Sequence, residues 1–538
     1  MINKLKDIDN RWLYIAAVLI LIPALFINLG LMSFIDDEAI RALVALEMKM
    51  SGNYIVPTMH GAFYYSKPPL FNWILIIFYN LSGVVNEWTT RIPTTLALMG
   101  YGYTIFYYFR KHFDTYTAVV NAFVLITCGR ILFWDSMLGL IDITYSWVTF
   151  TAFMVVFHEF KKGNFLRLFV LSYLLTGIGF MLKGFPSILF QGFTLLTWFL
   201  VEKQFKKLFT WKHILGGLVF VAIVGSYYFF YFNYNQTERV FEGLAQQSTT
   251  RTFIDQGWWN TFEHLFTFPF EMLYHFLPWS LLIIHFVRKD IRSQIQENRF
   301  IFYLLVIFLV NIIVYWTSPQ VYPRYVLMHA PLLFGVFVYL HQKNKGSLQF
   351  KLAEGAFFLF VAVFVGISFL PFFMKDLQDQ PNYLLKTIVV MIPLFLSAYL
   401  FVVKKDSRLL LLAIFLLIAR VGFNWFVLPE RNAEDSGAIV KETSVEIGNQ
   451  YKDKPLYIFN NTRMQPANSF YLTVTKGEII HFCRDTLPQG APFILDPSRN
   501  EDLEYQKLGE IYMRHLDQRY FDVGKLRGNK EIRNEGIR

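Results

Sequence analysis

Acidic, basic and aromatic side chains are concentrated between residues 35 and 91, directly after the first long apolar run of the chain. A positioned carboxylate suits removal of a proton from a hydroxyl nucleophile, and Lys or Arg suits a phosphate that gains charge as it leaves. Charged groups beside a bilayer are costly to desolvate, so their density here indicates a functional site. The candidate residues of this segment are Asp37, Glu38, Arg41, Tyr64 and Lys67.

Composition identifies the kind of protein that must position these groups. The 538 residues are 54% hydrophobic and 19% aromatic, which is typical of a membrane protein. The net charge of +10 comes from short basic clusters between apolar runs, which is a topology pattern and not a nucleic-acid groove. Cys128 and Cys483 predict neither a disulfide nor a zinc site, and there is no GxGxxG or GxxxxGK[ST] motif.

Thirteen apolar runs are long enough to predict transmembrane helices. A fourteenth, Leu70 to Val85, is short and contains Asn72, Asn80 and Gly83, so we expect it to dip into the interface without crossing. The thirteen runs are residues 13–34, 92–109, 115–134, 139–158, 165–182, 184–201, 213–233, 270–287, 300–316, 324–341, 352–374, 384–403 and 407–427.

The basic clusters orient these predicted helices. With thirteen crossings, the clusters at 110–111, 161–162, 203–212, 288–292, 343–345 and 404–408 all fall on one side, which the positive-inside rule makes cytoplasmic. The opposite side then receives the 35–91 loop and everything after about residue 428. We therefore predict a transmembrane domain at 1–429 with a catalytic outer loop at 35–91, and a small periplasmic α/β domain at 430–538. In that domain, three short apolar runs (456–459, 479–483 and 493–495) suggest strands, and 501–516 shows a helical pattern.

Further polar residues collect on the predicted outer face, and each has an alternative explanation. Asp142 is equally explained as the N-cap of its helix, and Lys183 as a snorkelling side chain. A lone interfacial His264 is more often a hydrogen-bonding residue than a metal ligand, and Arg324 with Tyr325 fits an aromatic belt. Arg420, inside the last predicted helix, requires an anion or a water-filled cavity.

Carboxylates, cations and tyrosines at the outer mouth of a helical bundle fit glycosyl transfer from a lipid-phosphate sugar. Phosphate hydrolysis or lipid phosphotransfer would need similar groups. A transporter or flippase would also have many helices and an Arg within one of them, but such folds show internal repeats, and we find no convincing repeat in this sequence.

Several motifs resemble one known family, the ArnT/protein O-mannosyltransferase-like glycosyltransferases, over about residues 10–430. The resemblance is closest to the branch that contains the lipid A 4-amino-4-deoxy-L-arabinose transferase. It implies the GT-C fold, about thirteen transmembrane helices, a periplasmic domain and a polyprenyl-phosphate-sugar donor. The matching residues are Asp37-Glu38, Glu47-Met48, GNYIVP at 52–57, Gly61, YYSKPPL at 64–70, Trp73, Asn86-Glu87, Arg91-Ile92-Pro93, Asp142, Lys183-Gly184, His264, Pro278-Trp279, Arg324-Tyr325 and Pro331.

The resemblance also assigns expected roles. Asp37 matches the proposed catalytic base and Asp142 a second required acid, whereas His264 matches a position associated with a divalent metal. Tyr64, Lys67 and Tyr325 match residues that line the donor phosphate pocket. Substrate-binding roles are also predicted, from charge and placement, for Glu38, Arg41, Lys183, Arg324 and Arg420. Two departures, Ser66 and Arg41, leave the sugar open. We expect a monomeric inverting enzyme of a bacterial inner membrane that modifies a lipid, glycan or protein acceptor; protein O-glycosylation is the alternative within the same fold.

Overall fold

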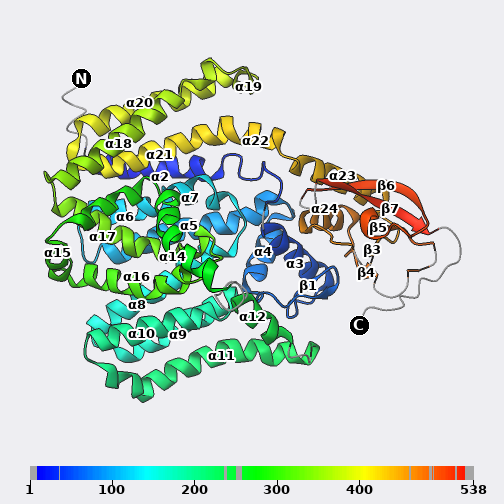
Figure 1. Ribbon diagram of the computed structural model, residues 1–538, viewed down its shortest axis with the longest axis horizontal. Coiled ribbons are helices and arrows are strands. Elements are labelled where there is room, and N and C mark those ends of the chain that lie inside the picture. Colours follow the sequence, from blue (N-terminus) through cyan, green and yellow to red (C-terminus); the bar gives the residue numbers. More distant parts are fainter. Residues whose placement is uncertain are drawn as a thin grey trace.

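The computed structural model describes the chain except residues 1–8, 36, 236–238, 250–256, 460–461, 484–486, 489, 515–517 and 527–538. Asp36 of the acidic segment therefore lies outside the described residues. The structure is a bundle of long helices with a small β-sheet at one end (Figure 1). The apolar runs form helices because only internal backbone hydrogen bonding satisfies peptide groups in lipid.

Seven described helices are long and apolar enough to cross a bilayer, or up to eight if the bent pair α6 and α7 counts as one span. The count of thirteen crossings therefore stays a prediction. Some predicted spans are short or irregular. The span 270–287 is divided between the end of α14 (Trp258–His275) and the 3₁₀ helix η3 (Trp279–Val287), and 324–341 between η4 (Pro323–Val326) and α17 (Ala330–Lys343). Near the predicted 407–427 span, helical structure continues past residue 429 to Glu434 through a π-helical turn.

The helices of the bundle are α2 (Asn10–Phe26), α5 (Glu87–Phe109), α6 (Thr115–Ile126), α7 (Gly129–Phe133), η1 (Asp135–Met137), α8 (Ile141–Lys161), α9 (Phe165–Lys183), α10 (Pro186–Val201), η2 (Phe205–Phe209), α11 (Trp211–Tyr234), α12 (Arg239–Thr249), α14 (Trp258–His275), η3 (Trp279–Val287), α15 (Ile291–Glu297), α16 (Arg299–Trp316), η4 (Pro323–Val326), α17 (Ala330–Lys343), α18 (Leu348–Ile367), η5 (Leu370–Phe372), α19 (Lys375–Gln378), α20 (Tyr383–Val403), η6 (Lys405–Ser407), α21 (Arg408–Gly422), η7 (Phe423–Val427) and α22 (Leu428–Glu434).

The 35–91 loop folds into two helices with a small hairpin between them. α3 (Glu38–Ser51) is followed by strands β1 (Thr58–Met59) and β2 (Ala62–Phe63), and then by the short α4 (Leu70–Ser82). In the sequence of α3, Ile40, Leu43, Val44 and Met48 recur at helical spacing, a pattern that predicts an amphipathic helix lying in the interface with one apolar face. Instead it is buried on nearly all sides, since it packs between α4 and a helix of the C-terminal region, α24. That helix supplies the second surface that the local pattern does not reveal.

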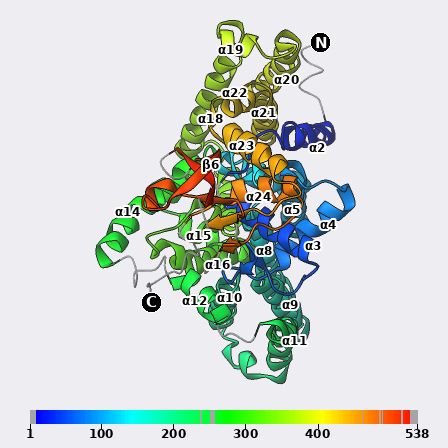
Figure 2. The same cartoon turned by 90° about the vertical axis from the view of Figure 1, so that its right-hand side faces the viewer.

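The C-terminal residues form a mixed five-stranded sheet with order β4-β3-β5-β7-β6. Two helices accompany it, and Figure 2 shows this region facing the viewer at one end of the bundle. The strands β3, β4 and β5 lie within the three short apolar runs. The elements are α23 (Gly437–Gln450), β3 (Tyr457–Phe459), α24 (Pro466–Lys476), β4 (Phe482–Cys483), β5 (Phe493–Leu495), η8 (Pro497–Arg499), β6 (Tyr505–Met513) and β7 (Arg519–Leu526).

The helical pattern at 501–516 was misleading, because most of that segment is the strand β6. It pairs antiparallel with β7, and its register shifts between Lys507 and Gly509. Such an irregularity breaks the two-residue alternation by which a strand is usually identified. Ile511 and Met513 then face the core of the sheet, whereas Tyr512 joins a second core with α3 and α24.

The C-terminal region and the 35–91 loop share buried polar contacts as well as this core. Glu87, 3% exposed, accepts hydrogen bonds from the Tyr471 hydroxyl (2.8 Å) and from Lys441 Nζ (2.7 Å). A Cβ added at Gly61 would lie 2.0 Å from the His481 ring, so only glycine permits this approach. The sheet region therefore packs directly on the loop that carries the candidate site.

Candidate active site

One arginine brings the two candidate catalytic carboxylates together. Arg324 Nη2 donates to Asp37 Oδ2 at 3.1 Å, and its Nε lies 3.6 Å from Asp142 Oδ2. The Arg324 side chain is only 2% exposed, whereas that of Asp37 is 47% exposed. Asp37 is the N-cap residue of α3 but makes no side-chain cap hydrogen bond. Its carboxylate is therefore held in place while an external molecule can still reach it.

Asp142 is tightly paired and mostly enclosed. Lys183 Nζ donates to Asp142 Oδ1 at 2.5 Å, and both side chains are 10% exposed. Asp142 occupies the first turn of α8, where the helix dipole favours a negative charge, but it caps no backbone group because Leu140 is the N-cap residue. Lys183, the last residue of α9, also lies 4.0 Å from the centre of the Tyr325 ring. The capping and snorkelling explanations do not describe these two residues.

Glu38 connects the segments that carry the two acids. Its carboxylate accepts hydrogen bonds from Arg91 Nη2 (2.6 Å) and Nε (3.1 Å), and from the backbone N–H of Gly139 (2.8 Å) and Ile35 (2.8 Å). Arg91 in turn donates to three carbonyl groups, those of Leu29, Met32 and Ser33. With 0% exposure, Glu38 is out of a substrate's reach. Its position favours a role in fixing the start of α3, and hence Asp37, against the start of α8.

Glu47 organises the hairpin that precedes Lys67. It accepts hydrogen bonds from Thr58 Oγ1 (2.9 Å) and from the backbone N–H of His60 (2.6 Å) and Gly61 (3.1 Å). Burial raises the pKa of Glu47, and these three donors oppose that rise. The hairpin leads to Lys67, which is partly buried and whose charge acts on Asp142.

Arg41 and Tyr64 form a second polar pair on the same loop. Arg41 Nη2 donates to the Tyr64 hydroxyl at 2.5 Å, and both residues are at most 9% exposed. Arg41 Nη1 is buried without a hydrogen-bond acceptor in the described part of the chain. An unsatisfied buried donor is costly, so this position suits an additional anionic or carbonyl oxygen.

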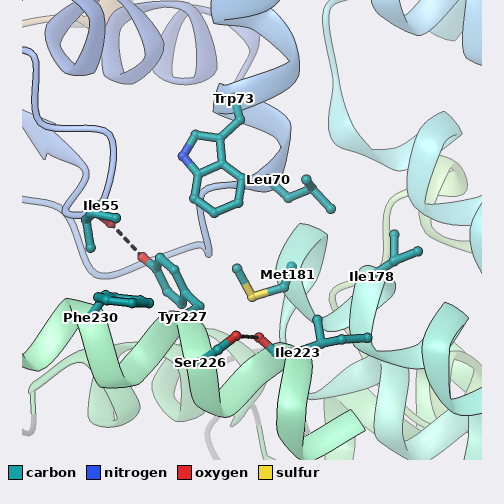
Figure 3. Close-up of a pocket in the computed structure, with 9 residues that line it drawn as sticks. All are labelled: Ile55, Leu70, Trp73, Ile178, Met181, Ile223, Ser226, Tyr227 and Phe230. Atoms are coloured by element: carbon teal, nitrogen blue, oxygen red, sulfur yellow. Dashed lines mark hydrogen bonds between the residues drawn. The ribbon is translucent and has the colours of Figure 1, made fainter. Parts of the chain in front are cut away.

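An apolar cavity of about 340 Å³ is lined by Leu70 and Trp73, which follow Lys67 in the chain. Figure 3 shows Leu70 and Trp73 on one side and the α11 residues Tyr227 and Phe230 on the other. The Tyr227 hydroxyl donates to the Ile55 carbonyl at 2.9 Å, so the main polar group on this wall is already satisfied. The cavity can accept a hydrocarbon chain beside the charged cluster.

Two predicted site residues have their contacts elsewhere. Arg420 donates to the Leu132 carbonyl and lies 5.2 Å from the centre of the Phe423 ring, with no contact to the carboxylates of the cluster. His264 Nδ1 is 3.0 Å from the Trp316 carbonyl. Across the described ranges, no group of three or more His, Cys, Asp or Glu side chains is arranged to hold a metal ion. The described residues around His264 therefore do not form a metal site.

Sequence reasoning missed the partners that hold the site together. Arg91 and Glu47 stood within matching motifs, but nothing in their spacing revealed that they anchor Glu38 and the hairpin. Asp135 was missed as well: Arg130 Nε lies 3.1 Å from both of its carboxylate oxygens, and Asp135 is 2% exposed. The available signal was an Arg and an Asp five residues apart at the break between two apolar runs.

Comparison with known proteins gives concordant likenesses. Residues 66–229 match the family described as dolichyl-phosphate-mannose-protein mannosyltransferase. Two proteins named undecaprenyl phosphate-alpha-4-amino-4-deoxy-L-arabinose arabinosyl transferase are each 24% identical: that of Shewanella sediminis over 36% of this chain and 36% of its own, and that of Edwardsiella ictaluri over 55% and 53%. The chain thus aligns with about a third to a half of these two curated relatives.

One solved structure has the same fold over nearly its whole length and nearly the whole length of this chain. The crystal structure of ArnT from Cupriavidus metallidurans bound to undecaprenyl phosphate superposes with a TM-score of 0.70 at 16% identity, covering 96% of this chain and 98% of that one. The chain therefore shares the fold of this ArnT structure, and the family match and the similar transferases together support an ArnT-like membrane glycosyltransferase with the GT-C fold.

Proposed function

We propose that this glycosyltransferase moves a sugar from a polyprenyl (undecaprenyl) phosphate donor to an envelope acceptor such as lipid A, at the periplasmic face of a bacterial inner membrane. The observation that carries the proposal is an accessible carboxylate, Asp37, in a group where cationic side chains outnumber carboxylates. Three cations, Lys183, Arg324 and Lys67, act on two carboxylates, Asp37 and Asp142. Such an excess suits a phosphate.

Charge and the apolar cavity together support a position for the donor. Lys67 and the unsatisfied Nη1 of Arg41 are the groups that we assign to the donor phosphate, with Tyr64 holding Arg41 in position. The hydrocarbon chain extends into the cavity between Leu70, Trp73 and α11. Undecaprenyl phosphate is the molecule bound in the similar ArnT structure, which supports a donor of this class.

Asp37 is the better candidate for the general base of the two acids. Its carboxylate is half exposed, whereas Asp142 is enclosed by Lys183 and Arg324. Asp37 takes the proton of the acceptor nucleophile, which attacks the anomeric carbon from the face opposite the phosphate. One displacement inverts the anomeric centre, as in inverting glycosidases. Lys67 and Arg41 stabilise the departing phosphate, so no strong acid is needed.

Protein O-glycosylation is the alternative, because residues 66–229 match a family described as protein mannosyltransferases. Mass spectrometry of lipids, glycans and envelope proteins from a deletion strain and its complemented parent separates the two. Loss of one lipid-linked modification on deletion, restored by the wild-type gene and not by an Asp37→Asn allele, supports the proposal. Loss confined to glycopeptides indicates the protein acceptor, and unchanged profiles in all three fractions contradict both.

A further inference from the structure

Three arginines meet beside two aromatic rings, near the Asp37 end of the bundle but outside the cluster that contains Asp142. The guanidinium carbons of Arg130 and Arg431 lie 5.8 and 5.7 Å from the centre of the Trp134 ring. Those of Arg431 and Arg420 lie 5.7 and 5.2 Å from the centre of the Phe423 ring. The three groups come from α7, α21 and α22, and only the fold brings them together.

Negative charge at this arginine cluster is insufficient. Arg130 is paired with Asp135. Arg420 is 1% exposed and donates to a backbone carbonyl, that of Leu132, while its Nε is buried without an acceptor. Arg431 makes no ion pair with any side chain that the structure describes. Within the described part of the chain, neither Arg420 nor Arg431 therefore has an ion-pair partner.

The neighbouring acids form no ion pair with Arg420 or Arg431. The Glu430 carboxylate, next to Arg431 in the chain, accepts a hydrogen bond from Gln380 Nε2 at 2.6 Å, Glu434 is exposed, and Asp435 is paired with Arg514 at 2.9 Å. A buried guanidinium with an unused donor is expensive in a membrane protein and marks a place where an anion binds. Planar guanidinium groups match phosphate oxygens in particular.

An apolar cavity of about 170 Å³ adjoins the arginine cluster. It lies between α18, α20 and the end of α21, and Phe133 and Phe423 are among its lining residues. Phe423 therefore has Arg420 and Arg431 near its ring and also lines the cavity. It belongs to the π-helical turn Phe423–Val427, a distortion that is frequent at functional sites.

We propose that Arg130, Arg420 and Arg431 bind a phosphate carried on a membrane lipid, whose hydrocarbon chain enters the cavity behind Phe423. This site is distinct from Lys67 and Arg41, the residues that we assign to the donor phosphate. The same chemistry is offered by a resident phospholipid and by a phosphorylated lipid acceptor. The proposal rests on charge and cavity alone, so it does not depend on the proposed transfer reaction.

The test is native mass spectrometry of the full-length protein in detergent, titrated with dioleoyl phosphatidylglycerol, dioleoyl phosphatidic acid or dioleoyl phosphatidylcholine. We expect one tightly retained anionic lipid on the wild type. Arg431→Gln, which removes a partly exposed charge, should weaken its retention about tenfold or more. Ala419→Leu, which narrows the cavity, should weaken it with all charges kept. Arg292→Gln, on an exposed residue away from the cluster, is the matched control and should bind like wild type.

Three results would overturn the proposal: equal retention of phosphatidylcholine, equal behaviour of Arg431→Gln and Arg292→Gln, or displacement of the lipid by millimolar inorganic phosphate alone. The KM for the acceptor distinguishes the two lipid sources. If the site binds the acceptor, Arg431→Gln raises the acceptor KM and leaves the donor KM unchanged. If it binds a resident phospholipid, phosphatidylglycerol retention falls and both KM values stay as in wild type.

Discussion

Two groups of charged side chains lie at opposite ends of the helical bundle, and their charges are balanced differently. One group surrounds Asp37 and Asp142, and the other, which we call the balanced end, is the group of ion pairs around His341. At the end that holds His341, charges meet opposite charges: Glu354 pairs with Arg408 (2.6 Å) and His341 (3.1 Å), and Asp406 with Lys345 (2.9 Å). In the group around Asp37, three cations, Lys67, Lys183 and Arg324, act on two carboxylates. The same helices connect the two ends. Helix α8 has Asp142 in its first turn and His158 in its last turn, and α17 begins six residues after Arg324 and has His341 in its last turn.

The two groups differ in whether their charges need a ligand. Balanced pairs satisfy one another and hold helix ends together, so they need no ligand. An excess of one sign in a partly desolvated site is stable only if a ligand of the opposite sign binds there. We therefore expect substitutions at the Asp37 end to change catalysis and matched substitutions at the His341 end to leave it unchanged.

The largest expected effect is that of Asp37→Asn. An amide cannot take the nucleophile's proton, so transfer should fall by about 10²- to 10⁴-fold while the fold is retained. The measurement is turnover per mole of monodisperse protein with a polyprenyl-phosphate sugar. Asp406→Asn, which removes an exposed acid of the balanced end, is the control. Wild-type turnover in the Asp37→Asn protein would exclude this residue as the base.

Glu38→Gln should mainly reduce stability. It leaves Arg91 charged and unpaired in a fully buried position, which costs about 3–5 kcal/mol. The free energy of unfolding from a detergent titration measures the loss. Glu297→Gln removes an exposed partner of Lys343 at the balanced end and should change stability by about 0–1 kcal/mol. Equal losses in both variants would mean that the Glu38–Arg91 pair does not anchor α3.

Lys67→Ala tests the cation excess directly. Loss of a group that stabilises the departing phosphate should cost on the order of 2–4 kcal/mol in the transition state. Lys67→Arg should recover part of the rate, because the charge remains while its geometry changes. Lys345→Ala at the balanced end should turn over like wild type. Near-normal specific activity of Lys67→Ala would remove this residue from the site.

The smallest expected effect is a loss of folding stability at low pH. It distinguishes His60, near the Asp37 group, from His341 at the balanced end. His341 contacts the Glu354 carboxylate, whereas His60 is buried beside Phe482, with its Nε2 at 2.7 Å from Ser469 Oγ. Burial lowers the pKa of His60 to about 4, so the folded protein holds it neutral. As the pH falls from about 6.5 to 4, the unfolded chain takes up a proton that the folded chain does not, and stability drops by about 3 kcal/mol or less.

His60→Asn should remove that loss while tolerating the left-handed backbone, since His60 has φ +57°. Unfolding is compared between pH 7 and pH 4 for both proteins, because the nearby Glu47, whose pKa is raised by burial, titrates in both and cancels in the difference. Parallel pH profiles would contradict the assignment of this acid sensitivity to His60.

Sequence reasoning found most of the candidate site because polar residues are rare in such an apolar chain. Asp37, Asp142, Lys183 and Arg324 all stood out, and the structure brings these four together. The sequence also suggested Arg420 and His264 as site residues, but in the structure both have other partners. The type of a charged residue and its depth in a predicted membrane segment indicate that its charge needs a partner. They do not identify which distant segment supplies that partner.

The C-terminal region shows the same limit. Three short apolar runs marked β3, β4 and β5, because continuous apolar stretches are typical of buried strands. The pattern at 501–516 predicted a helix and was wrong, since pairing with β7 and an irregular register override the local periodicity.

The sequence by itself determined a membrane protein with many apolar helices and a charged loop after the first of them, because hydrophobic length and charge placement are local properties of the chain. Only the tertiary structure decided the ion pairs of Asp142, the anchoring of Glu38 by Arg91, and the meeting of three arginines at Phe423. These contacts join residues far apart in the chain, such as Arg324 and Asp37, 287 positions apart. Their charges are balanced or left in excess by helix packing, which no local pattern encodes.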